Sequence, residues 1–412
     1  MHQFRIEPFQ PLQFGDGRAP DAAGLARTLR MPWPSTVLGA LRTALAARSG
    51  SLGHLVSGSD KSVDPVIGGR TDPGSLRILG PLVCTREDSQ LRLWVPRPAD
   101  VDAVADADGN PILRPFLPVK RESGDGEFGD FPLVPLAPED LRKPAGAAPF
   151  LVPWEWMMKW LANIENPGAP WGLDVVRARN GESVHVLGTE GRVHVTLTPG
   201  RTAEDGLLFE TEHVDLADEK EAAFWISVDG TDERSMGGMV TLGGQQGLAR
   251  VVPIDSPGFP EAAPGCLPDK VAKAIRESGG YLRVILLTPG VFRSGWTPDF
   301  SGLLAGSGGV LRAAFVPRYE AVSGSRLKAK GGAEPLPARR AAAAGSVYVL
   351  KFATPDRAVE AARALWFARL SDDPEPRFRD FGLAVTGAYP YAPLLDEAWA
   401  SMTNQDNPQG GN

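Results

Sequence analysis

The chain has 412 residues, of which 42% are hydrophobic and 23% charged, and this composition is ordinary for a soluble globular protein of two or three domains. The two cysteines, Cys84 and Cys266, lack CxxC spacing, which argues against a disulfide scaffold or a cysteine-based zinc site. The formal net charge is −7, no apolar run reaches the ~20 residues of a membrane span, and MHQFRIEPFQ lacks a signal pattern, so we expect a cytoplasmic protein.

The N-terminal region predicts a strand, a turn and a helix. Residues 3–14 alternate in hydrophobicity, and FGDGRAP follows as a glycine-containing turn. Ser35 is expected to cap the helix that ends at Gly50. Its apolar stripe at 3.6-residue spacing consists of Val37, Leu38, Leu41, Ala44 and Leu45.

The middle of the chain predicts an irregular region followed by several strands. Residues 51–150 are rich in Pro, Gly and Asp, and we interpret them as part of a long insertion. WEWMMKWLANI (154–164) is typical of a short amphipathic or buried helix. Strand-like runs follow at SVHVLG, RVHVTL, GLLFETEHV, AAFWISVDG and GGMVTLGGQQGLARVVPI, and a helix is predicted over 268–277.

The C-terminal region predicts strands over 281–287, 310–323 and 346–352, a helix over 356–370 and a strand over 382–387. Mixed strands with helices on one face favour an α+β fold of two ferredoxin-like (RRM-like) modules with long irregular insertions. We assign the first module to residues 1–279, with an insertion over about 51–180. The second covers residues 280–412 and is expected to end in a disordered tail from about 403.

Charge is unevenly distributed along the chain. Residues 280–352 contain ten Lys/Arg and three Asp/Glu, and residues 1–48 contain six Arg and three acidic residues. Residues 201–233 instead contain eleven acidic and two basic residues. Two basic regions at opposite ends indicate a polyanion-binding face, while the acidic region is expected to face solvent or a partner protein.

Catalytic and cofactor motifs are absent from the sequence. None of the five histidines has metal-ligand spacing, and no GxSxG, HExxH or Walker A motif occurs. The acidic run over 201–233 lacks the order of an EF-hand. We therefore expect a non-enzymatic protein with no cofactor and no metal.

Basic and aromatic residues predict an RNA-binding surface. Arginine donates forked hydrogen bonds to phosphate, and glycine lets backbone N–H groups approach it. Trp33, Trp296 and Tyr319 are candidates for stacking on unpaired bases, although the tryptophans are equally typical of buried loop anchors. The basic candidates are Arg18, Arg30 and Arg42 near the N-terminus, and Arg326, Lys328, Lys330, Arg339 and Arg340 in an expected flexible loop, SGSRLKAKGGAEPLPARR.

Several motifs, taken in order, resemble a known family. These are LQFGDGRAP, RMPWPSTVLGALRTAL, LGGQQGLARV, VILLTPGVFRSGWTPD, VSGSRLKAKGG…LPARRAAAAGSVYVLKF and FGLAVTG. Together they resemble subunit 3 of the Cmr complex, the type III-B CRISPR effector, within the RAMP superfamily. The resemblance spans both ends and the middle of the chain and lacks chiefly residues 51–180.

The resemblance implies a non-catalytic RNA-binding subunit. Such subunits hold the 5′ repeat-derived tag of the crRNA, cap the backbone filament, and contact the large polymerase/cyclase-like subunit and a backbone RAMP subunit. The residues that match its conserved blocks, with the neighbouring basic candidates, are Gly17, Arg18, Arg30, Trp33, Ser35, Arg42, Arg326, Lys328, Arg339 and Arg340.

Two motifs depart from the family pattern. Gln245 and Gln246 replace a Glu-containing block, and an amide side chain can hydrogen-bond a base edge without charge repulsion. Asp380 precedes Phe381 and Gly382 where the family has glycine, and we expect this carboxylate to repel phosphate.

Two other functions remain open from the sequence. A crRNA-processing endoribonuclease of the RAMP superfamily would need a titratable base beside the scissile phosphate, and no histidine lies in the Gly/Arg-rich segments. A protein adaptor would instead turn its basic segments toward acidic neighbours.

Overall fold

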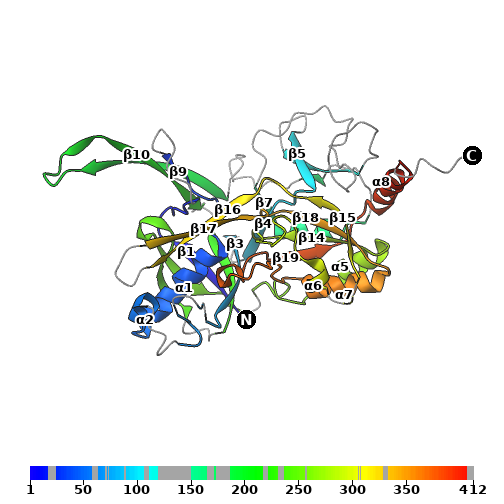
Figure 1. The fold of residues 1–412 in the computed structure, drawn as a ribbon, viewed down its shortest axis with the longest axis horizontal. Helices are drawn as coiled ribbons and strands as arrows, with labels where there is room; N and C mark the ends of the chain where they lie inside the picture. Colours follow the sequence, from blue (N-terminus) through cyan, green and yellow to red (C-terminus); the bar gives the residue numbers. More distant parts are fainter. Residues whose placement is uncertain are drawn as a thin grey trace, which may run out of the picture.

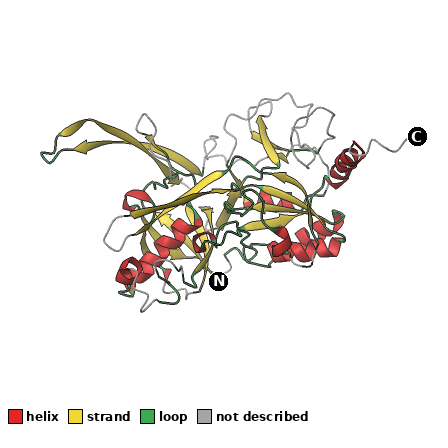
Figure 2. Ribbon diagram, viewed as in Figure 1, coloured by secondary structure: helices red, strands yellow, loops and turns green. Residues whose placement is uncertain are grey.

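The computed structural model describes residues 1–16, 25–57, 64–69, 72, 74–87, 90–105, 111–118, 150–164, 171–172, 186–216, 221–230, 236–255, 258–304, 306, 308–327 and 333–405. These residues form a mixed α/β structure with several antiparallel sheets and few helices (Figures 1 and 2). The coarse prediction of a mixed α+β architecture is thus confirmed.

A seven-stranded sheet dominates the N-terminal side of the molecule. All of its strand pairs are antiparallel, and β1 lies between β13 and β11. The order across the sheet is β12 (Gly238–Thr241), β13 (Leu248–Pro253), β1 (His2–Pro8), β11 (Ala223–Asp229), β3 (Arg77–Glu87), β4 (Gln90–Pro96) and β7 (Leu151–Pro153).

The interpretation of residues 51–150 as irregular is wrong for β3 and β4, and also for the two strands within 101–115. β3 is buried on both faces, so its apolar residues do not alternate with polar ones. Pro81 further weakens the strand pattern, and the register shifts opposite it, where Leu82 pairs with Trp225 and Leu79 with Ser227. Proline is tolerated at such an irregularity because no ladder hydrogen bond is needed there.

Helix α1 (Pro34–Arg48) covers one face of this sheet and is followed by α2 (Leu52–Ser57). Its N-cap residue is Trp33 and not Ser35, because Pro34 already has helical geometry at the first position. The predicted apolar stripe is confirmed, since Val37, Leu38 and Leu41 are buried.

The C-terminal side contains a four-stranded antiparallel sheet. Its order is β15 (Val310–Phe315), β18 (Val347–Lys351), β14 (Tyr281–Leu286) and β19 (Ala384–Gly387). Helices α5 (Asp269–Glu277) and α7 (Pro355–Leu365) pack against each other and against this sheet, while α6 (Phe300–Leu303) follows β14. Figure 1 shows α8 (Ala392–Gln405) at the far end of this side. The tail expected from about 403 overlaps its last turn at 403–405, and residues 406–412 lie outside the described residues.

Two hydrophobic clusters lie on opposite sides of the central strands. In β11, Phe224 and Ile226 pack in the cluster that contains α1, while Ala223 and Trp225 pack in the cluster that contains the C-terminal sheet. β11 therefore separates two cores and contributes to both. The boundary assigned at 279/280 stays a prediction.

A buried ion pair between Arg283 of β14 and Asp100 joins four segments of the chain. Arg283 is fully buried, donates to Asp100 at 2.8 Å, and also donates to the carbonyl oxygens of Trp160 and Ala388. Its guanidinium lies 4.4 Å from the centroid of the Trp160 ring. Helix α3 (Trp154–Leu161), predicted as a short helix, is thus held against the C-terminal sheet.

Three smaller sheets extend from these layers. β9 (Leu187–Leu197) and β10 (Ala203–Leu216) form a long arm with β2 (Leu25–Ala26) at its base, and β5 (Val101–Ala105), β6 (Pro111–Pro115) and β8 (Trp171–Gly172) form another sheet. β16 (Glu320–Leu327) and β17 (Ala333–Ala341) form a two-stranded hairpin. Within the described part of the chain, no helix is long and apolar enough to cross a membrane.

Candidate RNA-binding groove

The expected flexible loop that carries Arg326, Arg339 and Arg340 is instead a β-hairpin. Seven cross-strand pairs join β16 and β17, from Glu320–Ala341 to Leu327–Ala333. Pro335, Pro337 and the surrounding charged residues hid the strand pattern, but β17 is largely exposed and at a sheet edge, where proline is tolerated. Lys328 and Lys330 lie outside the described residues, and so do Gly17 and Arg18.

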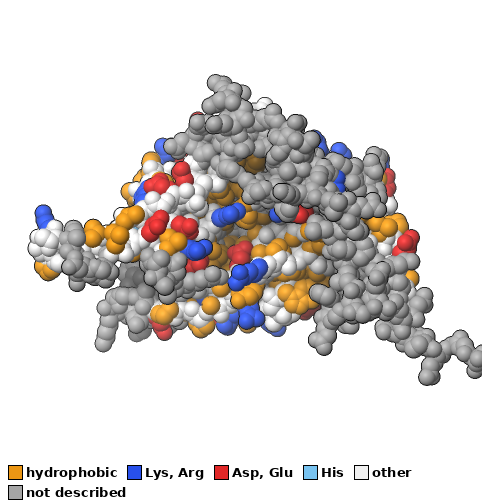
Figure 3. Space-filling model, turned by 90° about the horizontal axis from the view of Figure 1, so that it is seen from above, with side chains coloured by type: hydrophobic (Ala, Val, Ile, Leu, Met, Phe, Trp, Pro, Cys, Tyr) orange, Lys and Arg blue, Asp and Glu red, His pale blue; other side chains and the backbone are white. Residues whose placement is uncertain are grey.

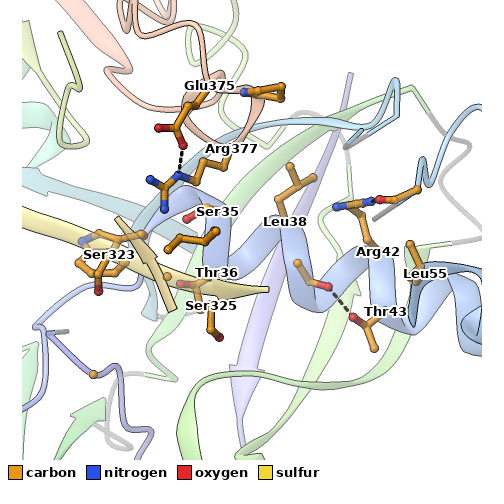
Figure 4. A pocket seen from close by; sticks show the side chains of 17 residues that line it. Ser35, Thr36, Leu38, Arg42, Thr43, Leu55, Ser323, Ser325, Glu375 and Arg377 are labelled. Atoms are coloured by element: carbon orange, nitrogen blue, oxygen red, sulfur yellow. Dashed lines mark hydrogen bonds and ion pairs between the residues drawn. The ribbon is translucent and has the colours of Figure 1, made fainter. Parts of the chain in front are cut away.

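A groove of about 720 Å³ lies between this hairpin and α1 (Figure 4). The α1 side presents Trp33, which precedes the helix, and Ser35, Thr36, Gly39 and Arg42, which share one face of it. The opposite wall comes from the hairpin and from the segment at η4 (Pro376–Phe378), and it consists of Ser323, Gly324, Ser325, Leu336, Glu375, Pro376 and Arg377. The sequence motifs from the two ends of the chain therefore meet at one groove.

The start of α1 lies at this groove, where Thr36 N and Val37 N donate to Trp33 O at 2.9 and 3.2 Å and Pro34 has no N–H. No side chain caps the helix and its first turn contains no acidic residue. The helix dipole gives this end of the helix a partial positive charge. An anion in the groove beside Ser35 and Thr36 would be stabilised by this end of the helix.

Two buried donors in the groove wall have no acceptor among the described residues. They are Trp33 Nε1 and Arg377 Nη1. The other nitrogens of Arg377 are engaged, since Nε donates to Glu375 and Nη2 to the carbonyl oxygen of Pro337, both at 2.7 Å. Because an unsatisfied buried donor is costly, a ligand oxygen at this wall would be favoured. Arg377 is not among the site residues predicted from the sequence, because its place in the groove depends on contacts with a hairpin some 40 residues earlier.

Trp33 is a buried anchor and not an exposed stacking platform. Its side chain is 6% exposed and packs with Val322 and Ala341 of the hairpin and with Phe378 and Phe381. This packing attaches the start of α1 to the hairpin. The other two aromatic candidates, Trp296 and Tyr319, are both exposed.

The side chain of Arg42 is held by main-chain carbonyl oxygens of the segment that follows α2. Its Nε donates to Ile67 O and its Nη2 to Gly69 O, each at 2.6 Å. Burial lowers the pKa of Arg42, and the positive charge of Arg379 lowers that pKa further. Its charge is therefore poorly solvated, so a nearby anion would stabilise it.

Asp380 does not point a carboxylate at the groove as the sequence suggested. It is buried and pairs with Arg77 at 2.8 Å, Arg369 at 3.1 Å and Arg379 at 3.6 Å. One negative charge is shared by three positive ones, so the expectation that Asp380 repels phosphate is wrong. Burial is the main cause that lowers the pKa of both Arg369 and Arg379.

The remaining predicted residues differ in how accessible they are. Arg339 donates to Glu375 at 2.5 Å and lies 3.5 Å from Asp373, so acidic neighbours already engage it. Arg340 points to the other face of the hairpin, where its guanidinium lies 4.9 Å from the centroid of the exposed Tyr319 ring. The backbone of Arg326 pairs with Glu334.

Three further predicted residues, Arg30, Gln245 and Gln246, are not among the residues that line the groove. Arg30 is exposed and lies 5.5 Å from the centroid of the Phe150 ring. Gln245 and Gln246 are exposed on a turn that follows Gly243 and Gly244, and Gly244 N donates to Gln13 O at 2.7 Å. The glutamine turn thus lies against residues that precede Gly15, a residue of the groove lining.

No group of three potential His, Cys, Asp or Glu metal ligands occurs among the residues that the structure describes. No curated protein matches the sequence. A chain of the cryo-EM structure of the type III-B Cmr-beta bound to cognate target RNA and AMPPnP is 14% identical, with a TM-score of 0.43 and coverage of 84% of this chain and 86% of that one. A chain of the crystal structure of a Csm3-Csm4 subcomplex from the type III-A interference complex is 11% identical, with a TM-score of 0.33 and coverage of 85% and 93%.

The family comparison covers most of the sequence. The pattern of the CRISPR-associated protein Cmr3 matches residues 4–388, which include both walls of the groove and the hairpin. The chain belongs to the Cmr3 family of CRISPR-associated proteins.

Proposed function

We propose that this protein is a non-catalytic crRNA-binding subunit of a type III-B CRISPR effector (Cmr) complex. It would hold the 5′ repeat-derived tag of the guide and cap the backbone filament next to the large polymerase/cyclase-like subunit. The observation that carries the proposal is the groove between α1 and the β16–β17 hairpin, in a chain whose family match spans residues 4–388.

Strand order supports the inference of two ferredoxin-like modules. In that fold the four strands, numbered along the chain, lie in the order 4-1-3-2. β19, β14, β18 and β15 have this order, and so do β13, β1, β11 and β3 in the larger sheet. In the C-terminal set α7 connects the third strand, β18, to the fourth, β19. In the larger sheet α1 lies between the first strand, β1, and the second, β3.

The lining of the groove suits a single-stranded RNA backbone. Small residues, including Gly39, Ser323 and Gly324, let a ligand approach the main chain, and hydroxyl groups of serine and threonine can donate to phosphate. Arg42, Arg377 and the start of α1 provide positive charge. Tyr319 and Arg340 on the outer face of the hairpin offer a stacking surface and a phosphate contact.

The composition of the groove favours binding over cleavage. General acid–base cleavage of RNA needs a titratable group beside the scissile phosphate. Glu375 is the one carboxylate among the lining residues described, and it pairs with Arg339 and Arg377. His194 lies on the arm, where it bonds Thr211 at 2.8 Å. The alternative of a crRNA-processing endoribonuclease therefore has less support.

The direct test is binding of a fluorescent 5′-tag oligoribonucleotide, measured by anisotropy at several salt concentrations. Replacing Arg340 and Tyr319 by alanine should weaken binding about tenfold or more, since base stacking alone contributes about 1–3 kcal/mol. The salt slope should also become less steep, because one phosphate contact is lost.

The matched control is Arg276→Ala, which removes an exposed arginine that pairs with Asp356 away from the hairpin. It should leave the affinity unchanged. Equal binding by the Tyr319→Ala/Arg340→Ala variant and the unmodified protein would count against the hairpin as an RNA contact. Cleavage of the oligonucleotide, lost in His194→Ala, would support the nuclease alternative.

A further inference from the structure

The β9–β10 arm extends away from both large sheets (Figure 1). Its two strands pair continuously from Leu208–Val195 to Leu216–Leu187, and β9 forms the outer edge of the three-stranded sheet. Beyond β2, which pairs with Glu210 and Thr211, the arm is a two-stranded ribbon, and such a ribbon is marginally stable in water unless another surface covers it. We therefore expect another surface to cover the projecting part of the arm.

One face of the arm is apolar and exposed. Val193, Val195 and Leu208 are 67%, 46% and 66% exposed, and Val195 pairs directly with Leu208. Figure 3 shows hydrophobic side chains along the projecting arm. On the opposite face His194 and Phe209 stack at 5.0 Å between ring centroids, which stiffens the ribbon. Contiguous apolar groups on a stiff projection are typical of an interaction site.

The charge of the arm decides between RNA and protein as the occupant. Residues 187–216 contain six acidic residues (Glu190, Glu204, Asp205, Glu210, Glu212 and Asp215) and two basic ones (Arg192 and Arg201), a net charge of −4. Glu210 pairs directly with Val193, so a carboxylate borders the apolar face. A phosphate backbone would be repelled here, whereas a protein surface with lysine or arginine around an apolar centre would be complementary.

We propose that the arm docks onto a neighbouring protein subunit through the face formed by Val193, Val195 and Leu208. The surface it fits is apolar at its centre and basic at its rim. This inference rests on the proposed function, because it takes the neighbour to be another subunit of the effector complex. The groove binds RNA at one site, and the arm binds protein at another.

The test measures two interactions of the same purified variants. Affinity for the isolated large subunit and for the isolated backbone subunit is measured by biolayer interferometry, and affinity for the tag oligonucleotide by anisotropy. Val193→Ser/Leu208→Ser should weaken binding to at least one subunit about tenfold or more and leave RNA affinity unchanged. Glu210→Lys should also weaken that subunit interaction, most strongly at low salt.

Val310→Ser/Leu303→Ser is the matched control, since both side chains are exposed on the C-terminal side. It should behave like the unmodified protein. Unchanged subunit binding by the arm variant would overturn the inference. So would loss of RNA affinity in that variant, tighter RNA binding by Glu210→Lys, or a self-association of the chain that the arm variant abolishes. If the unmodified chain binds the tag but neither subunit, the docking inference fails while the RNA-binding proposal stands.

Discussion

At the scale of single residues, Gln245 and Gln246 have an unusual backbone. Their φ angles are +52° and +55°, a left-handed conformation that costs a non-glycine residue roughly 1–2 kcal/mol. The neighbouring glycines cannot be exchanged freely, since a Cβ on Gly243 would lie 2.5 Å from Gln13 O. Exposed side chains kept at strained positions are typical of functional sites.

Replacing both glutamines by glycine separates strain from contact. Gln245→Gly/Gln246→Gly should leave the free energy of unfolding unchanged or raise it by up to about 1 kcal/mol, because the strain is removed while chain entropy is lost. It should lower the affinity for tag RNA about two- to tenfold for each lost hydrogen bond. Urea unfolding and anisotropy measure the two effects.

Arg201→Gly is the control for stability, since Arg201 is also exposed, with φ +60° at the turn of the arm. Unaltered RNA affinity in the glutamine variant would show that these side chains do not contact the tag.

The sequence indicated which basic and aromatic residues belong to the candidate site but not which partners each side chain contacts. Trp33 was equally compatible with a core and a surface position, and its contacts with Phe378 and Phe381 settle the choice. Arg339 and Arg340 are adjacent in sequence, yet strand geometry turns them to opposite faces, so one meets Glu375 and the other Tyr319. Such differences depend on partners that are distant in sequence.

At the scale of elements, Asp380 joins the start of β3 to the segment that follows α7. Arg77 and Arg379 also exchange bonds with main-chain oxygens across this junction, since Arg77 donates to Arg379 O and Arg379 donates to Gly74 O. The carboxylate therefore balances a cluster of arginines whose charges would otherwise repel one another.

Asp380→Asn should lower the free energy of unfolding by about 3 kcal/mol, because it leaves three partly buried arginines without their buried counterion. Tag RNA affinity should not rise, since the carboxylate does not face the groove. Urea unfolding and anisotropy test both expectations. Asp356→Asn is the control, and its exposed pair with Arg276 should contribute about 1 kcal/mol or less. A stable Asp380→Asn protein that binds RNA more tightly would contradict this account.

Elements with an uninterrupted pattern were predictable, whether one-sided as in α5 or wholly apolar as in β14, and elements interrupted by proline or largely exposed were not. α5 was expected over 268–277 and lies at Asp269–Glu277, and β14 was expected over 281–287 and lies at Tyr281–Leu286. β3 escaped prediction because Gly80 and Pro81 interrupt its apolar run, and β17 because most of it is exposed. Neither shows the alternation that identifies a half-buried strand.

At the scale of the whole molecule, the central strands unite the two halves. Phe224 and Trp225 are adjacent in β11 but belong to different hydrophobic clusters, one with α1 and one with the C-terminal sheet. The hairpin that follows β15 returns to pack on Trp33 at the start of α1. The groove exists because these distant segments are held together, so composition alone could not reveal it.

The central claim is that the groove between α1 and the β16–β17 hairpin holds the guide tag. Its most direct test is photocrosslinking of a crRNA with 4-thiouridine in the 5′ tag within the assembled complex, with the crosslinked peptides identified by mass spectrometry. The account predicts crosslinks in peptides that contain residues 33–43, 320–341 and 375–377. Tag crosslinks confined to other subunits, or to the β9–β10 arm of this chain, would contradict it.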